Sequence, residues 1–305
     1  MSDIAIKEIE TKNIMTKSSG PLGGYAVNPY TGCTHGCRYC YASFMKRFTG
    51  HTEPWGKFLD VKDWPKVDPS KYDGQTVLLG TVTDPYVPQE KKYLRTRRLL
   101  EQLVGSKADI TICTRSDLVL RDLDILKELE KVTVSFSVNT LDDSFRRDMD
   151  KAVSIERRLD AMKVLYDEGI RTVTFISPVF PGITDIEAIV RRTKDQCDLV
   201  WLENLNLRGG FKSDILSYIE EEHPDLVPLY RQIYTKKDRS YFIDLEKKAE
   251  ALAQELGCPF TNNWTPYGRA EPGHPVIVDY FYHEEVRNTN NTGVRNRKYA
   301  VRSFR

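Results

Sequence analysis

Three cysteines lie close together near the start of the chain, in the segment NPYTGCTHGCRYCYA at residues 28–42. Cys33, Cys37 and Cys40 have the spacing C-x3-C-x2-C. Three thiolates can hold three corners of an iron–sulfur cube and leave one iron open, as a site that binds a reactant requires. Gly32 and Gly36 favour a tightly curved loop around such a cluster, because glycine accepts backbone conformations that other residues avoid.

Two other interpretations of these cysteines stay open at this point. Zinc accepts three thiolates and one imidazole, and His35 or His51 could supply the imidazole, although His35 lies inside the loop and would be cramped. The three cysteines could also be buried structural thiols, since free cysteine behaves as a small hydrophobe.

The whole chain has 305 residues, enough for one large α/β domain and a small appendage. Its 45 basic and 44 acidic residues nearly cancel, so no global charge indicates a nucleic-acid or membrane partner. The first 15 residues contain acidic side chains and no apolar core, which predicts no signal peptide, no membrane span and a cytoplasmic protein. Six cysteines, three of them clustered, fit a reducing compartment and metal binding better than disulfides.

Short β-rich runs alternate with amphipathic runs, which is typical of βα units around a parallel sheet. The amphipathic runs between these strands predict four helices. The expected strands are Gly24–Asn28, Thr76–Val82, Asp109–Thr114, Val132–Val138, Arg171–Ser177 and Leu199–Glu203. The expected helices are Gln89–Val104, Asp122–Glu130, Ser154–Glu168 and Asp185–Cys197.

Six such units predict an open version of the eight-unit barrel, so the expected fold is α/β, a partial (β/α)6 TIM-type barrel with a mostly helical C-terminal extension. Helices are expected at 212–221 and 238–257, and an irregular stretch at 258–275. The expected division is an N-terminal segment at 1–24, the barrel at 25–210 and the extension at 211–305. The insertion 44–73 is long for a connection, and its tryptophans and prolines predict an ordered loop.

Several polar residues follow expected strands, where functional groups gather in parallel barrels. The cysteines follow the first strand, Thr83 follows the second, Arg115 ends the third and Ser137 ends the fourth. We therefore expect these side chains at one mouth of the barrel.

The cysteine segment resembles that of the radical S-adenosylmethionine (SAM) superfamily. Together with TVTDPYVPQE (81–90) and CTRSDLVLRD (113–122), it is similar to the spore photoproduct lyase-like branch over about 13–208. The resemblance implies a 4Fe-4S cluster on the three cysteines, with SAM chelated at the open iron. One electron then cleaves SAM to methionine and a 5'-deoxyadenosyl radical, which abstracts hydrogen from a substrate.

The resemblance also implies positions for SAM. Thr83 would contact its amino group, Arg115 its carboxylate and Ser137 its ribose, with Arg158 a second carboxylate candidate. Arginine suits a carboxylate because its planar fork donates two parallel hydrogen bonds. Tyr39 flanks the last thiolate and could shield the cofactor.

The hydrogen donor is where the chain departs from the resemblance. The lyase carries a donor cysteine just before the residue equated with Thr83, and this position is Val82 here. Authentic photoproduct repair is therefore doubtful. Tyr41 or Cys113 could take over this role, and Cys113 should share a strand face with Arg115.

The substrate is not identified by sequence, and a nucleic acid, a peptide or a small molecule would each be compatible with the chemistry. A basic tail, Arg287 to Arg305, could grip phosphates and stack bases. Basic residues also cluster in the helix expected after residue 89. An electron donor such as flavodoxin or ferredoxin is implied. The hypothesis of another class is a non-catalytic module that holds zinc or a structural iron–sulfur cluster.

Overall fold

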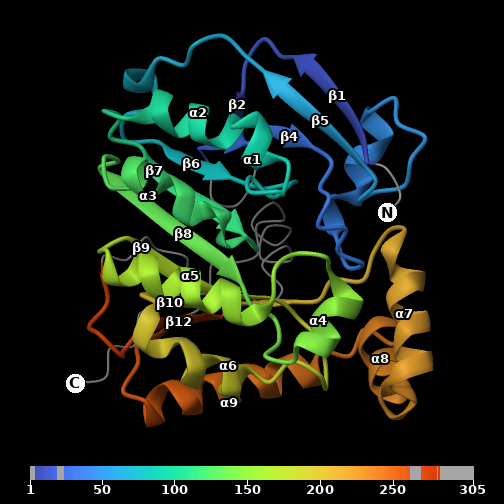
Figure 1. Cartoon of the computed structure of the whole chain (residues 1–305). Helices are drawn as coiled ribbons and strands as arrows, with labels where there is room; N and C mark the ends of the chain where they lie inside the picture. Colours follow the sequence, from blue (N-terminus) through green and yellow to red (C-terminus); the bar gives the residue numbers. More distant parts are fainter. Residues whose placement is uncertain (1–3, 19–23, 262–268, 280, 282–305) are drawn as a thin grey trace, which may run out of the picture. The chain divides into compact units, whose positions relative to one another are not determined.

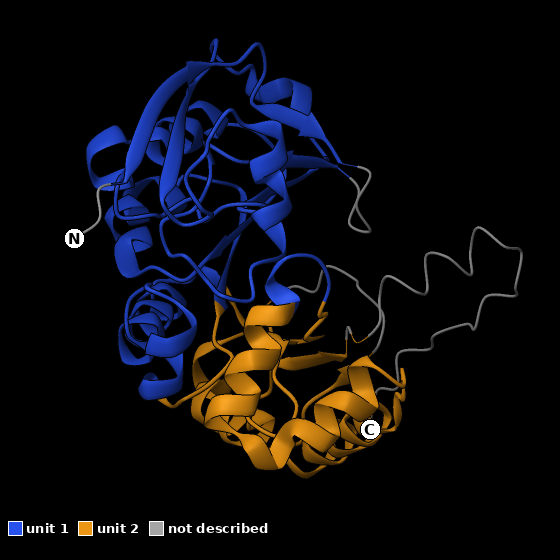
Figure 2. Ribbon diagram, turned by 90° about the vertical axis from the view of Figure 1, so that its right-hand side faces the viewer, with its two compact units in different colours: residues 1–136, 143–171, 208–212 blue, residues 137–142, 172–207, 213–305 orange. Residues whose placement is uncertain are grey.

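The structure is a computed structural model that describes residues 4–18, 24–261, 269–279 and 281. It divides into two compact units, coloured separately in Figure 2. Unit 1 comprises residues 1–136, 143–171 and 208–212, and unit 2 comprises residues 137–142, 172–207 and 213–305. This division into two units differs from the domain boundaries that we expected at residues 24 and 210, and those boundaries stay a prediction.

Unit 1 is built on a mainly parallel sheet with the strand order β2-β3-β6-β7-β8 (Figure 1). Its centre is apolar, because Val77 of β6 pairs with Ile110 of β7 and both are fully buried. The four strands expected in this part are confirmed, and antiparallel β2 is added at the edge. The bounds are β2 (Met15–Lys17), β3 (Tyr25–Val27), β6 (Thr76–Leu79), β7 (Asp109–Thr114) and β8 (Lys131–Ser137).

A second, three-stranded sheet in unit 1 was not predicted. It consists of β1 (Ala5–Glu10), β5 (Phe58–Asp63) and β4 (Tyr30–Thr31), with β5 in the middle. The long insertion is ordered as expected, but it contributes β5, whose first four residues are buried. Sequence patterns missed this sheet because its three strands come from distant parts of the chain, and two of them are too short or too charged to be recognised alone.

The helices of unit 1 follow the predicted pattern in part, because the helix expected from Asp122 to Glu130 is only Leu123–Leu126 and the helix Asp143–Met149 was not predicted. The helix expected from Gln89 to Val104 is interrupted at Leu94, whose φ of 53° lies in the left-handed region. Ser154 caps α5 by accepting a hydrogen bond from the Arg157 amide, and the helix stops before Gly169, as expected. The bounds are η1 (Tyr41–Phe48), η2 (Pro69–Tyr72), α1 (Glu90–Tyr93), α2 (Arg95–Leu103), η3 (Asp117–Asp122), α3 (Leu123–Leu126), α4 (Asp143–Met149) and α5 (Ile155–Asp167).

Unit 2 carries parallel strands in the order β9-β10-β12-β11. The expected strands β9 (Arg171–Val179) and β10 (Leu199–Asn204) are confirmed. The C-terminal extension is mostly helical, as expected, but it also adds β11 (Phe260–Thr261) and β12 (Val276–Asp279). The helices are α6 (Ile186–Thr193), η4 (Lys194–Gln196), most of α7 (Phe211–Glu222), η5 (Pro224–Leu226), α8 (Val227–Tyr234) and α9 (Ser240–Glu255).

The helices were also compared with the length and apolarity that a membrane span requires. In the described part of the chain, none of them is both long and apolar enough to cross a bilayer.

Candidate active site

The loop of residues 32–40, here called the cysteine loop, connects β4 to η1 in unit 1. Gly32 has a φ of 87°, and a Cβ atom there would lie 2.5 Å from the carbonyl oxygen of Phe58. Gly56 of the insertion is equally confined, since its Cβ would lie 2.9 Å from the Cα of Gly36. Only glycine fits these positions, so the loop curves tightly against the second sheet.

The three thiols of the cysteine loop are free of disulfides. Burial raises the pKa of Cys33 to about 12, and the charges of Asp84 and Cys40 act in the same direction. Burial also raises the pKa of Cys37 and Cys40, whereas the cation of Arg115 opposes this rise at both. Thiolates at these positions therefore need a further cation, and iron in a cluster would supply one. The three thiols interact with one another, and they fit an iron–sulfur cluster as its donor set, with Cys33 buried and Cys37 and Cys40 half-buried.

The imidazoles considered for a zinc site have other neighbours. His51 places Nδ1 3.0 Å from Glu53 Oε2 and Nε2 2.7 Å from Asp60 Oδ1, so neither ring nitrogen faces the cysteines. Within residues that the structure describes, no three His, Cys, Asp or Glu side chains converge as a single metal ion requires. An iron–sulfur cube needs no such convergence, because each thiolate binds a different iron.

Arg115 lies next to the cysteine loop, just beyond the end of β7. Its Cζ is 5.7 Å from the ring centroid of Tyr39, and its Nε is buried without a hydrogen-bond partner. In the described ranges its guanidinium takes part in no ion pair, although its backbone amide donates to Asp84 Oδ2 at 2.8 Å. A half-buried cation whose Nε is buried without a hydrogen-bond partner favours an anionic partner, so this group could receive the carboxylate of a ligand.

Asp84, which follows the same expected strand as Thr83 but to which the sequence assigned no role, joins three segments near the cysteine loop. Its Oδ1 accepts from Thr114 Oγ1 at 2.8 Å and from the Tyr86 amide at 2.8 Å. Its Oδ2 lies 3.6 Å from Nδ1 of buried His35. The only signal in the sequence was the Asp-Pro turn after a strand.

Thr83 is also tied to the cysteine loop. Its buried hydroxyl donates to the carbonyl oxygen of Gly32 at 2.6 Å. Because the hydroxyl proton is used in this bond, the oxygen can only accept hydrogen bonds from a ligand. The role predicted for Thr83, contact with an ammonium group, is compatible with this state and stays a prediction.

Asp150 anchors the other side of the loop and was likewise missed. Its Oδ1 accepts from Nη2 of Arg158 at 2.8 Å, and its Oδ2 lies 3.5 Å from the Tyr39 hydroxyl. Arg158 is fully buried and also donates from Nε to the Val153 carbonyl at 3.0 Å. Arg158 therefore already has an internal carboxylate, and its contact with SAM stays a prediction. The isolated Asp150 carried no sequence signal.

The two hydrogen-donor candidates differ in exposure. Tyr41 is 55% exposed, and its hydroxyl donates to the carbonyl oxygen of Thr81, next to Val82. Asn28, the first residue of the motif, holds the same turn by accepting from the Val82 amide at 3.0 Å. Cys113 is half-buried in β7, with Ser135 as its neighbour in β8. Both roles stay predictions.

Ser137 ends β8 and is buried, but it is counted with unit 2, and its predicted contact with the SAM ribose stays a prediction. Elsewhere in unit 2, Ser177 Oγ donates to Glu203 Oε2 at 2.6 Å.

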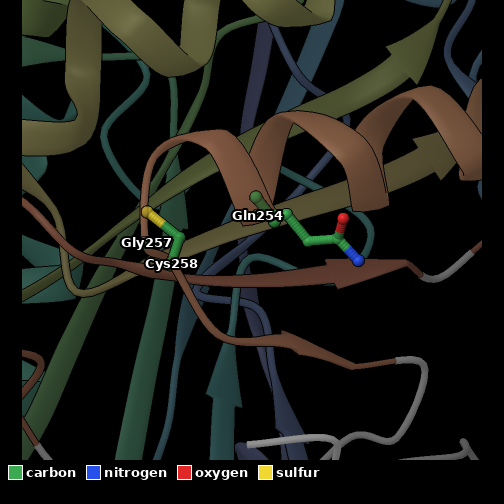
Figure 3. A pocket seen from close by; sticks show the side chains of 4 residues that line it. Gln254, Gly257 and Cys258 are labelled. Atoms are coloured by element: carbon green, nitrogen blue, oxygen red, sulfur yellow. The ribbon is translucent and has the colours of Figure 1, made fainter. Parts of the chain in front are cut away.

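A pocket of about 270 Å³ lies at the end of α9, lined by Ala253, Gln254, Gly257 and Cys258 (Figure 3). It shares no residue with the site around the cysteine loop. The basic tail lies outside the described residues.

Comparison with known proteins identifies the family. A family model described as the radical SAM superfamily matches residues 27–192, more than half of the chain, and this range contains every residue of the site around the cysteine loop as well as Ser137. The chain belongs to the radical SAM superfamily. Membership implies an enzyme that uses SAM and an iron–sulfur cluster, and enzymes of this superfamily generally need a reductant.

Three relatives of this radical SAM protein are informative. An uncharacterized protein of Methanocaldococcus jannaschii is 33% identical over 226 residues, covering 73% of this chain and 86% of its own. The "Radical SAM Nalpha-GlyT isomerase" of Pseudomonas phage M6 is 29% identical over 53% of this chain and 33% of its own. A structure of spore photoproduct lyase complexed with dinucleoside spore photoproduct has a TM-score of 0.54 at 14% identity, covering 90% of this chain and 82% of that one. The last likeness confirms the expected fold class, an α/β partial barrel.

Proposed function

We propose that the protein cleaves SAM reductively with one site-differentiated 4Fe-4S cluster held by Cys33, Cys37 and Cys40, and abstracts hydrogen from a substrate. The carrying observation is the pairing of three neighbouring, disulfide-free thiols with the guanidinium of Arg115, whose Nε is buried without a hydrogen bond and which forms no ion pair with a described residue. The thiols supply the donors of a cluster, and the guanidinium supplies what the carboxylate of SAM requires.

The surrounding residues have definable tasks in this proposal. Arg115 donates to the SAM carboxylate, and the Thr83 oxygen accepts from the SAM ammonium because its own proton goes to Gly32. Asp84 holds the Arg115 amide and Asp150 lies against Tyr39, so both act as positioning residues. Arg158 orients Asp150 rather than SAM in this arrangement.

The bound cluster and SAM together supply one-electron cleavage of SAM to methionine and a 5'-deoxyadenosyl radical. Tyr39, which is buried over this region, excludes water from it. Tyr41 holds its phenol at the turn next to Val82, where it can donate a hydrogen atom to a product radical, and Cys113 is the second candidate. A flavodoxin or ferredoxin would supply the electron.

We further propose that the substrate contains a nucleobase. The lyase structure of similar fold holds a dinucleoside lesion, and this supports the proposal by analogy. A nucleic-acid substrate predicts binding that weakens with salt, because neutralised phosphates release counterions.

The deciding experiment is anaerobic reconstitution with iron and sulfide, followed by dithionite and SAM and chromatography of 5'-deoxyadenosine. Wild-type protein should bind about four irons per chain and form the product, whereas Cys37→Ala should lose both. Cys258→Ala is the matched control, because that thiol is buried in unit 2 and belongs to no cluster in this proposal. Full iron content and product formation by Cys37→Ala would contradict the ligand assignment.

A further inference from the structure

A row of exposed aromatic side chains follows directly after the last cysteine of the loop. Tyr41, Phe44 and Phe48 of η1 are 55%, 43% and 66% exposed. Among the described residues, the large hydrophobic side chains that are exposed include three aromatic rings, and all three lie in this one element. Together with Arg47 they are called the aromatic surface below.

The rings of the aromatic surface are arranged around one cation. Phe44 and Phe48 meet edge to face with centroids 6.4 Å apart. The Cζ of Arg47 lies 5.4 Å from the first ring centroid and 4.7 Å from the second. As far as the structure describes the chain, Arg47 has no carboxylate partner, and Lys46 donates only to the Thr52 carbonyl at 3.0 Å. The positive charge of this surface is therefore not neutralised from within the described fold.

The sequence around the aromatic surface is also free of acidic residues. From Thr11 to Thr52 the chain has five lysines and arginines and no aspartate or glutamate, although the whole chain has 44 acidic residues. The positive potential of the surface is thus a local property of this segment, and it favours an acidic partner.

The aromatic surface is joined to the cysteine loop by covalent and hydrogen bonds. Cys40 is the residue before η1, and its carbonyl accepts from the Ser43 amide at 3.2 Å. Ala42 packs inward and is 3% exposed, so η1 is held against unit 1 with its aromatic side outward. A molecule seated on this surface lies close along the chain to a proposed cluster ligand.

We propose that the aromatic surface is the docking site of an acidic one-electron carrier that exposes the edge of a flavin. This inference rests on the proposed function, which requires a reductant. The flavin ring can stack on one of the two phenylalanine rings and meet the other edge to face, while carboxylates of the carrier pair with Arg47 and Lys46. One electron would pass from the carrier to the cluster that Cys33, Cys37 and Cys40 would hold, so the carrier is oxidised and the cluster is reduced by one electron, and no atom or proton is transferred.

The size and composition of the surface favour a carrier over a nucleic acid. Strand-binding proteins track the phosphate backbone with a positively charged groove. Here two cations, Lys46 and Arg47, accompany three rings, which matches a small, transient electron-transfer contact.

Binding of the carrier can be tested without turnover. Cluster-loaded protein is immobilised anaerobically, and a bacterial flavodoxin is titrated by biolayer interferometry. Arg47→Glu should weaken binding about tenfold or more, and added salt should weaken wild-type binding. Lys91→Glu is the matched control, since it makes the same charge reversal at an exposed site on α1 and should bind like wild type. Equal affinity of Arg47→Glu and wild type would overturn the proposal.

A comparison of two reductants separates this inference from the proposed function. Arg47→Glu should retain 5'-deoxyadenosine formation with dithionite and lose it with limiting reduced flavodoxin. Unchanged flavodoxin-driven turnover, combined with lost binding of an oligothymidylate, would overturn the proposal and assign the surface to nucleic acid. A wild-type protein without cluster or product under dithionite would instead contradict the proposed function, while the binding result would still test the surface.

Discussion

Two regions of unit 1 are rich in arginine, and their arginines are in opposite states. On the face formed by α2 and η3, each guanidinium meets carboxylates: Arg97 contacts Asp122 and Asp124, and Arg98 contacts Asp63. Around the cysteine loop and η1, Arg115 and Arg47 have no ion-pair partner in the described residues. A sequence segment rich in arginine therefore does not by itself indicate a binding site. An arginine that the fold leaves without an ion-pair partner is a better indicator.

The paired face is also a structural link to the cysteine loop. Arg121 donates to Glu90 and Asp122, both fully buried, at 2.7 Å each. Glu90 in turn accepts from the hydroxyl of buried Tyr30 in β4, two residues before Gly32. The paired arginines hold the scaffold, and the unpaired ones remain open to ligands.

The largest effect is expected from breaking the paired face. Arg121→Met leaves buried Glu90 without its cation and leaves Asp122 with Arg97 alone, and it should lower the free energy of unfolding by about 3–5 kcal/mol, measured by urea denaturation. Arg147→Met is the control, because this arginine is 62% exposed and pairs with partly exposed Asp143; it should cost less than about 1 kcal/mol. Equal losses in both variants would remove the distinction between the two kinds of pairing.

A smaller effect, of a different kind, is expected at the unpaired site. Arg115→Met should weaken SAM binding to cluster-loaded protein roughly 10- to 100-fold, the contribution of charge-assisted hydrogen bonds, as measured by anaerobic calorimetry. Its free energy of unfolding without SAM should fall by less than about 1 kcal/mol, because the guanidinium has no ion pair with a described residue to lose and gives up only its contact with the Tyr39 ring. Arg115→Lys, which keeps the charge without the fork, should be intermediate. If Arg115→Met lowered the free energy of unfolding but bound SAM with normal affinity, Arg115 would have a structural role and no role in SAM binding.

The smallest effect is expected on the stability of the fold at acidic pH. A hydrogen bond from Arg97 lowers the pKa of Asp124, and one from Arg98 lowers the pKa of Asp63. Carboxylates with lowered pKa stabilise the fold above their ordinary pKa near 3.8, and this stabilisation is lost as pH falls through the folded-state pKa. Asp124→Asn should therefore flatten the decrease of the melting temperature between about pH 5 and about pH 2. Arg47→Gln should leave this decrease unchanged, and the same flattening in both variants would contradict the assignment.

Much of the fold could be predicted because its signals are local. The strands Asp109–Thr114 and Leu199–Asn204 are apolar runs with polar ends, and the helix Ile155–Asp167 has both a serine cap and a terminal glycine. The sheet of β1, β4 and β5 could not be predicted, since hydrogen bonds between distant segments define it. The break at Leu94 was hidden as well, because leucine favours helices and only the tertiary contacts impose its left-handed backbone.

The sequence by itself determined the kind of chemistry. The spacing of Cys33, Cys37 and Cys40, with glycines that let the loop curve, is a property of nine consecutive residues and needs no partner to be recognised. Tertiary structure decided which of two candidate arginines is available. Arg115 and Arg158 look alike in the sequence, but Asp150 lies 2.8 Å from Arg158 and none of the described carboxylates forms an ion pair with the Arg115 side chain. A charge becomes a binding group only where folding leaves it without a partner, and that depends on residues far away in the chain.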